Sequence, residues 1–141
     1  MPIYHCHTPQ RLLSNSAKGK LAGEITRIHS EVTGESPSFI NVLFLDIPDG
    51  TSFKGGESSS RSFVFGEIRH GYDVQTRHTL LRDLSQMWTR LTSQPEAETI
   101  VALRETPAEN ATQAGLIFAG PGHEQQWLDE NRDKLAEFGL S

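Results

Sequence analysis

The chain has 141 residues, of which 35% are hydrophobic and 22% charged, and its formal net charge is −5. This length suits one domain with a real core, and the acidic balance, with only 13 Lys and Arg residues, argues against a nucleic-acid partner. The single cysteine excludes an internal disulfide, and with no membrane-length apolar run and no signal-peptide pattern we expect a cytosolic protein.

The first part of the chain predicts a β-α-β unit. Residues 2–8 alternate between apolar and polar side chains as a strand does, and Ser14-Asn15-Ser16 is a plausible helix N-cap cluster. A helix ending near Gly34 is indicated by apolar residues at spacings of three and four, namely Ala17, Leu21, Ile25, Ile28 and Val32. Residues 39–47 are rich in apolar and β-branched side chains and predict a mostly buried strand.

The middle of the chain repeats the same order of elements. Residues 51–61 predict a loop or hairpin tip, and residues 62–69 a strand. A helix over 74–91 carries its apolar stripe at helical spacing, and residues 99–103 predict a third buried strand.

These patterns predict one α/β (α+β) domain over residues 1–141. It divides into β-α-β units at 2–50 and 51–106 and a tail at 107–141 with one helix from about His123 to Phe138. The tandem units should form a four-stranded mixed sheet with two helices on one face. Because the other face would be left bare and apolar, we expect an oligomer to cover it.

Pro2 is the most informative single residue, because it follows the initiator Met1 and opens the first strand. If Met1 is removed, Pro2 carries a secondary amine, which can accept and return a proton, whereas an amide nitrogen cannot. Partial burial near cations would bring its pKa toward neutrality, where a general base works best. The alternative is that this proline only begins an edge strand, where its missing N–H does no harm.

Several short motifs occur in a distinctive order and spacing along nearly the whole chain. They are Pro2-Ile3-Tyr4, Ser16-Ala17-Lys18, Ile25-Thr26-x-x-His29 with Thr33-Gly34, Phe63-Val64-x-Gly66-x-x-Arg69-x-Gly71, Glu105-x-Pro107 and Pro121-Gly122-His123-Glu124-x-x-Trp127. In this order the chain resembles the tautomerase superfamily, in particular its cis-3-chloroacrylic acid dehalogenase-like branch. The resemblance implies a homotrimer that needs no cofactor, with Pro2 as the catalytic proton carrier.

The same resemblance implies that His29 and Arg69 help to hold a small carboxylate substrate. A guanidinium suits that role, because charge-assisted hydrogen bonds to a carboxylate are strong. Where the dehalogenase pattern has a second arginine, this chain has Tyr72; where it has a tyrosine, the chain has Ala102; and where it has a glutamate, Gln113. Arg104 could supply a nearby charge in place of the missing arginine.

These departures favour one reaction over another. The neutral amide of Gln113 cannot take a proton from water, so we expect hydrolytic dehalogenation to be weak or absent. Tautomerisation asks for less, and the sequence therefore predicts a tautomerase or isomerase acting on small 2-oxo acids or their enols. The alternatives are a hydratase, dehalogenase or decarboxylase of an unsaturated or β-oxo acid, and a non-catalytic ligand-binding trimer with a decayed site.

Two other patterns predict no site. In His5-Cys6-His7 the two histidines lie on one face of the strand and Cys6 lies on the other, so at most two of them could bind one ion. Because a structural zinc needs four ligands, we expect no metal. The Gly55-Gly56 and Ser58-Ser59-Ser60 stretch lacks the ending of a phosphate-binding loop. Nothing in the sequence calls for a nucleotide, flavin or haem.

Overall fold

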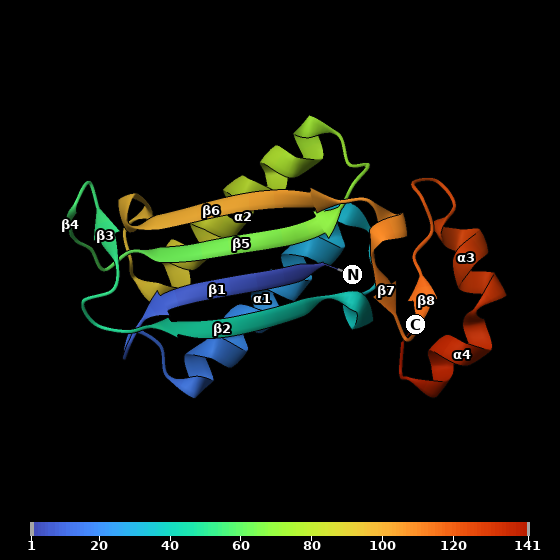
Figure 1. The fold of residues 1–141 in the computed structure, drawn as a ribbon, viewed down its shortest axis with the longest axis horizontal. Helices are drawn as coiled ribbons and strands as arrows, with labels where there is room; N and C mark the ends of the chain where they lie inside the picture. Colours follow the sequence, from blue (N-terminus) through green and yellow to red (C-terminus); the bar gives the residue numbers. More distant parts are fainter. Residues whose placement is uncertain (1, 141) are drawn as a thin grey trace.

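The centre of the protein is a four-stranded mixed sheet, seen here in a computed structural model that describes residues 2–140. The strand order is β2 (Asn41–Ile47), β1 (Ile3–Pro9), β5 (Ser62–Arg69) and β6 (Thr99–Thr106). β1 is parallel to β2 and β5 is parallel to β6, while the central pair β1 and β5 is antiparallel (Figure 1). The predicted tandem β-α-β arrangement is confirmed.

Two helices, α1 (Asn15–Thr33) and α2 (Val74–Thr92), form the crossovers between the parallel strand pairs. Both lie behind the sheet in Figure 1, so the prediction of two helices on one face is confirmed. Each helix is preceded by an N-cap residue, Ser14 or Asp73, whose side-chain oxygen accepts a hydrogen bond from a backbone N–H of the first turn. Such caps satisfy N–H groups that have no partner inside the helix.

The core lies between the helices and the sheet face that they cover. Alternate residues of β1 and β5 are buried there against the apolar stripes of α1 and α2, as the period of two in a strand requires. Gly66 permits the closest approach in this layer. A Cβ at this position would lie 2.6 Å from Cε1 of Tyr4, which is opposite Gly66 across the β1–β5 ladder. Only glycine leaves room for the tyrosine ring.

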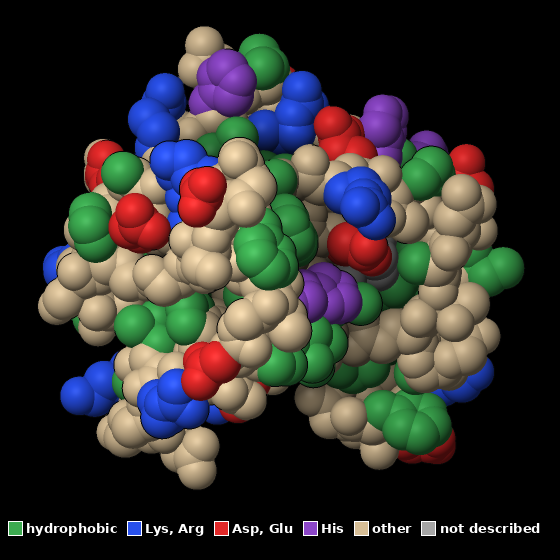
Figure 2. Space-filling model, turned by 60° about the vertical axis from the view of Figure 1, so that its left-hand side comes forward, with side chains coloured by type: hydrophobic (Ala, Val, Ile, Leu, Met, Phe, Trp, Pro, Cys, Tyr) green, Lys and Arg blue, Asp and Glu red, His purple; other side chains and the backbone are tan. Residues whose placement is uncertain are grey.

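The other face of the sheet is open, and large hydrophobic side chains reach its surface. Leu43 is 48% exposed, Leu45 45%, and Phe65 and Ile100 41% each. Figure 2 looks obliquely at the molecule and shows green hydrophobic side chains at the surface beside a purple histidine in a hollow. The predictions of buried strands at 39–47 and 99–103 are therefore wrong for the single chain, because helices cover only one face and alternate side chains of β2 and β6 stay accessible.

Smaller elements complete the chain. Two hairpins are formed by β3 (Phe53–Lys54) with β4 (Glu57–Ser58) and by β7 (Thr112–Gln113) with β8 (Leu116–Ile117). Three 3₁₀ turns precede β2, β6 and β7, at Pro37–Phe39, Glu96–Glu98 and Ala108–Asn110. The first turn explains why β2 begins at Asn41 rather than at Phe39.

The tail lies beyond the sheet edge at which β1 begins and β5 and β6 end (Figure 1). It contains α3 (Glu124–Glu130) and α4 (Arg132–Glu137) instead of the one helix predicted there. The break is at Asn131, whose side-chain amide and backbone N–H both donate to the carbonyl of Trp127. An asparagine side chain that competes for backbone groups in this way interrupts a helix.

Within residues 2–140, no helix combines the length and the apolar character that crossing a membrane requires.

Candidate active site

A chain of polar contacts begins beneath the first strand, at Tyr4 and His29. The Tyr4 hydroxyl lies 2.8 Å from Nδ1 of His29, and both side chains are fully buried. Burial, followed by the nearby Glu35 charge, raises the pKa of Tyr4 well above its ordinary value, so Tyr4 keeps its proton as a donor. When Tyr4 donates to Nδ1, the proton of His29 is on Nε2, which lies 2.7 Å from Oε2 of Glu35. Both ring nitrogens of His29 are thus occupied.

Glu35 is the centre of the network. It follows α1 directly, and its Oε2 accepts hydrogen bonds from His29 and from the Tyr72 hydroxyl, the latter at 2.7 Å. Burial alone would raise the pKa of this carboxyl, but the hydrogen bonds from His29 and Tyr72 and the Arg69 charge outweigh it and lower the pKa to about 2. Glu35 is therefore ionised at neutral pH. The Tyr72 pKa is raised to about 12 by burial and by the Glu35 charge, so Tyr72 remains a donor.

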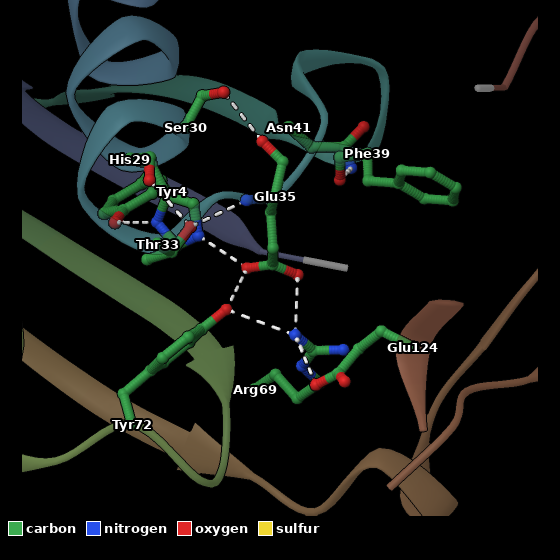
Figure 3. A network of polar contacts seen from close by, with 10 residues as sticks. All are labelled: Tyr4, His29, Ser30, Thr33, Glu35, Phe39, Asn41, Arg69, Tyr72 and Glu124. Carbon is green, nitrogen blue, oxygen red and sulfur yellow. Dashed lines mark hydrogen bonds and ion pairs between the residues drawn. The ribbon is translucent and has the colours of Figure 1, made fainter. Parts of the chain in front are cut away.

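Arg69, the last residue of β5, lies between two carboxylates. Its Nη2 donates to the Tyr72 hydroxyl at 3.3 Å, is 3.9 Å from Oε1 of Glu35, and is 3.2 Å from Oε1 of Glu124. The Arg69 side chain is only 12% exposed and the Glu124 side chain 37%. Figure 3 shows Glu124 approaching Arg69 from the tail while Glu35 approaches from the opposite side. Arg69 is thus held on one side by Glu35 and Tyr72. Its partner on the other side, Glu124 from the tail, is accessible to solvent.

A cavity of about 330 Å³ opens beside this network. Its polar lining includes Glu35, Arg69, Tyr72 and Glu124, and its apolar lining comes from Phe39, Phe118, Trp127 and Leu128. The sheet body supplies one wall and the tail the other. A concave, mostly apolar space with a few convergent polar groups is what a small-molecule site requires.

Pro2 lies at the same edge of the sheet. Ile3 is opposite Glu67 in the antiparallel β1–β5 ladder, so Pro2 comes opposite Ile68, one residue before Arg69. The Pro2 ring is buried, and its carbonyl accepts a hydrogen bond of 2.9 Å from the backbone N–H of Asn41. Pro2 is not among the residues that line the cavity. The predicted removal of Met1 concerns a residue outside the described range.

The structure thus brings three predicted site residues, His29, Arg69 and Tyr72, into one network, although His29 is buried beneath the cavity rather than in its wall. It does not bring Arg104 or Gln113 to that cavity. Arg104 is on β6, where its side chain is 81% exposed and pairs with Glu67 at 3.5 Å. Gln113 is in β7, opposite Leu116. Substrate contacts by these two residues stay predictions.

Sequence reasoning missed two acidic residues and an aromatic group. Glu124 stands inside one of the quoted motifs, but its neighbour in space, Arg69, is 55 positions earlier in the chain. Glu35 directly follows the quoted Thr33-Gly34, and its position just after the helix end could have drawn attention to it. The clustering of Phe39 with Phe118 and Trp127 depends on the fold of the tail and has no local signal.

Among the described residues, no three or more His, Cys, Asp or Glu side chains are grouped so that they could hold a metal ion.

A four-stranded mixed sheet built from two β-α-β units is the fold expected for the tautomerase superfamily. The sequence comparison agrees with the fold. Residues 1–132 match the family described as "Putative oxalocrotonate tautomerase enzyme", and the chain belongs to that family. No curated protein matches the sequence.

Solved structures support the same assignment. The crystal structure of native Ps01740 is 32% identical, with a TM-score of 0.77, and the match covers 79% of this chain and 99% of the other. N1, a member of the cis-3-chloroacrylic acid dehalogenase family, is 21% identical with a TM-score of 0.87, over 96% of this chain and 99% of N1. A symmetric trimer of fused 4-OT shares the fold at 17% identity and a TM-score of 0.77, over 83% of this chain and 95% of that one. The predicted superfamily is confirmed.

Proposed function

We propose that this protein is a tautomerase or isomerase of small 2-oxo acids and their enols, with the Pro2 amine as its acid–base catalyst. The observation that carries the proposal is the position of Arg69. This largely buried arginine lies at the edge of the sheet where Pro2 precedes β1, and it faces a cavity large enough for a small organic acid. Membership in the tautomerase family supports an enzymatic role.

The chemistry needs one proton carrier and one anchor. Arg69 holds the substrate carboxylate, taking over the place of Glu124, while Glu35 and Tyr72 fix the guanidinium. The Pro2 nitrogen takes the proton from the enol hydroxyl as the carbonyl forms, and a proton is delivered from Pro2 to C3, so no proton is gained or lost. His29 is a positioning residue in this scheme, because it orients Glu35 through Nε2.

Hydration and hydrolytic dehalogenation are less well supported. Both need a base that activates water, and Gln113, where the dehalogenase pattern has a glutamate, is a neutral amide. Two carboxylates line the cavity. Glu35 has its pKa lowered to about 2 and is a poor base, and Glu124 is paired with Arg69 at 3.2 Å. We therefore expect hydration and hydrolytic dehalogenation to be weak or absent.

The protein is further proposed to work as a homotrimer in the cytosol. Large apolar side chains on the open sheet face, including Leu43 and Phe65, need cover that the single chain does not provide. Structures of fused 4-OT with this fold are described as trimers. The alternative of a non-catalytic ligand-binding trimer predicts the same assembly but no dependence of any reaction on Pro2.

The test combines intact mass with kinetics. The mass of the purified protein shows whether Met1 has been removed, and the rate of enol-to-keto conversion of phenylenolpyruvate is compared for the native protein and Pro2→Ala. We expect a processed chain and a loss of about 10²–10⁴-fold in kcat for Pro2→Ala, the usual contribution of a general acid–base group. An uncleaved Met1, or a rate that the substitution leaves unchanged, would contradict the proposal.

A further inference from the structure

One wall of the cavity is aromatic, and three ring contacts define it. Phe118 and Trp127, both from the tail, are stacked with ring centroids 5.4 Å apart and planes 29° apart. Phe39, from the turn before β2, meets each of them edge-on, at 6.3 Å from Phe118 and 6.4 Å from Trp127. The indole N–H of Trp127 donates to the carbonyl of Ile117 at 2.8 Å. The indole is therefore held in place rather than free to rotate.

This aromatic wall lies in the same cavity as Arg69. A ligand held there by its carboxylate lies in the same open cavity as Phe39, Phe118 and Trp127. The cavity volume of about 330 Å³ is near the lower end of the range for small-molecule sites, about 300–1,000 Å³. Among the described residues that line the cavity there is no histidine and no cation other than Arg69. The cavity thus offers one anion anchor and one apolar, flat surface.

From this arrangement we propose a substrate class, resting on the proposed function: monocarboxylic 2-oxo acids or enols that carry an aromatic or other flat apolar arm. The carboxylate pairs with Arg69, and the arm packs against Phe39, Phe118 and Trp127. Aromatic pairs in offset or edge-on geometry gain more than their buried area alone provides. Trp127 and Phe118 are the specificity-determining residues in this assignment.

Two other kinds of acid fit the cavity less well. A short alkyl acid reaches Arg69 but leaves the aromatic wall in contact with water, so it loses the apolar contribution to binding. A dicarboxylate brings a second charge that must lie against the aromatic wall or beside Glu35, which is ionised because its pKa is lowered to about 2. An unpaired charge in such a place is costly.

The first test measures exchange of the C3 hydrogens in D₂O by NMR for phenylpyruvate, 2-oxobutanoate and 2-oxoglutarate, each divided by its own rate without protein. Normalised kcat/KM should fall in that order, and Trp127→Ala should lower the value for phenylpyruvate about 10-fold or more while changing that for 2-oxobutanoate less than about 3-fold. Phe138→Ala, which removes a 60% exposed aromatic ring of the tail outside the cavity, is the matched control and should change neither.

A second test does not need turnover. Calorimetry on Pro2→Ala compares the binding of 3-phenylpropanoate and butanoate, and we expect at least about 10-fold tighter binding of the aromatic acid, a preference that Trp127→Ala removes. If no acid exchanges but this preference holds, the proposed function fails and the substrate class stands as a ligand class. Equal affinities for the two acids, or equal losses for both in Trp127→Ala, would overturn the substrate class even if Pro2-dependent exchange is found.

Discussion

The two β-α-β units end their helices in the same way but place different chemistry there. In the first unit, the Thr33 hydroxyl at the end of α1 donates to the carbonyl of His29 at 2.7 Å and accepts from the backbone N–H of Glu35 at 3.2 Å. The residue between them, Gly34, has φ +80°, the left-handed conformation that ends many helices. This turn presents His29 and Glu35 to each other.

The second unit repeats the turn at the opposite edge of the sheet. The Thr92 hydroxyl donates to the carbonyl of Trp88 at 2.7 Å and accepts from the N–H of Gln94 at 3.1 Å, with Ser93 at φ +64°. Trp88 and Gln94 occupy the places of His29 and Glu35. Here Oε1 of Gln94 accepts from the Trp88 indole at 2.9 Å and from the Ser62 hydroxyl at 2.6 Å.

The difference shows what makes one edge a candidate active site. Both turns bury a hydrogen-bonded side chain, but only the first has a charged acceptor, which is matched by Arg69 and faces a cavity. In the second unit the neutral amide of Gln94 satisfies its neighbours without any ionised partner among those hydrogen bonds. The same backbone motif thus serves packing in one unit and electrostatics in the other.

The largest effect on stability is expected when a carboxylate is placed in the turn of the second unit. Gln94→Glu would bury a carboxylate among hydrogen-bond partners that include no cation. It would also lie beside the Ser60 carbonyl, which now accepts from Gln94. We expect a loss of about 3–5 kcal/mol in the free energy of unfolding at pH 7, the usual cost of an uncompensated buried charge. Because the folded-state pKa of this carboxyl would be raised, the loss should shrink as the pH falls. Urea unfolding at pH 7 and pH 4 measures it, and a loss independent of pH would contradict the reasoning.

The opposite change removes the charge from the first unit. The Glu35 pKa is lowered from its ordinary 4.5 to about 2, so its stabilisation is fully present above about pH 4.5 and is lost as the pH falls toward 2. Glu35→Gln should therefore cost about 3 kcal/mol at pH 7, and this difference from the native protein should disappear near pH 2. Urea unfolding of both proteins over that range tests it. A difference that stays constant with pH would mean that Glu35 acts by packing alone.

The anchor itself is tested by Arg69→Gln. Loss of a charge-assisted hydrogen bond worth about 1.5–3 kcal/mol should weaken the binding of 3-phenylpropanoate about 10- to 150-fold. Arg27→Gln, which removes an exposed guanidinium that pairs with Glu24 and Glu31 on α1, is the matched control. Calorimetry and unfolding curves for both variants separate binding from stability. Unchanged affinity in a folded Arg69→Gln protein would remove Arg69 from the site.

The smallest expected effect concerns the ion pair that a substrate must displace. Glu124 is 37% exposed and competes for Arg69, so Glu124→Gln should tighten the binding of 3-phenylpropanoate by up to about 5-fold, the scale of an exposed ion pair. Glu130→Gln on the same helix, whose carboxylate accepts from Gln126 instead, should leave the affinity unchanged. Weaker binding in Glu124→Gln would show that this carboxylate supports the ligand site rather than competing for it.

The elements that follow from local patterns were predictable from the sequence. Helical spacing located α1 and α2, and an N-cap cluster also marked the start of α1. Strand patterns at 2–8 and 62–69 located β1 and β5, because these signals act between residues close in the chain. The break at Asn131 depends on one side-chain hydrogen bond, and the exposure of β2 depends on which faces the helices cover. Local hydrophobic periodicity therefore predicts neither the helix break nor the exposure of β2.

The candidate site divides in the same way. His29 and Arg69 were found through the resemblance of whole motifs to a family, and the structure joins them through Glu35 and Tyr72. The pairing of Glu124 with Arg69 could not be predicted, because the two residues are far apart in the chain and meet only in the folded structure. Contacts between such distant segments leave no regular spacing in the sequence from which they could be predicted.

The most direct test uses the two tryptophans, Trp88 in the second unit and Trp127 in the tail. Their indole N–H signals are followed by NMR while 3-phenylpropanoate is added, with Trp127→Phe and Trp88→Phe used to assign them. Trp127 lines the cavity, whereas Trp88 is fully buried in the equivalent turn of the second unit. We predict that the Trp127 signal shifts with saturation while the Trp88 signal stays in place. A saturating shift of Trp88 alone, or no shift of either signal, would contradict the assignment of the ligand site to the charged turn of the first unit.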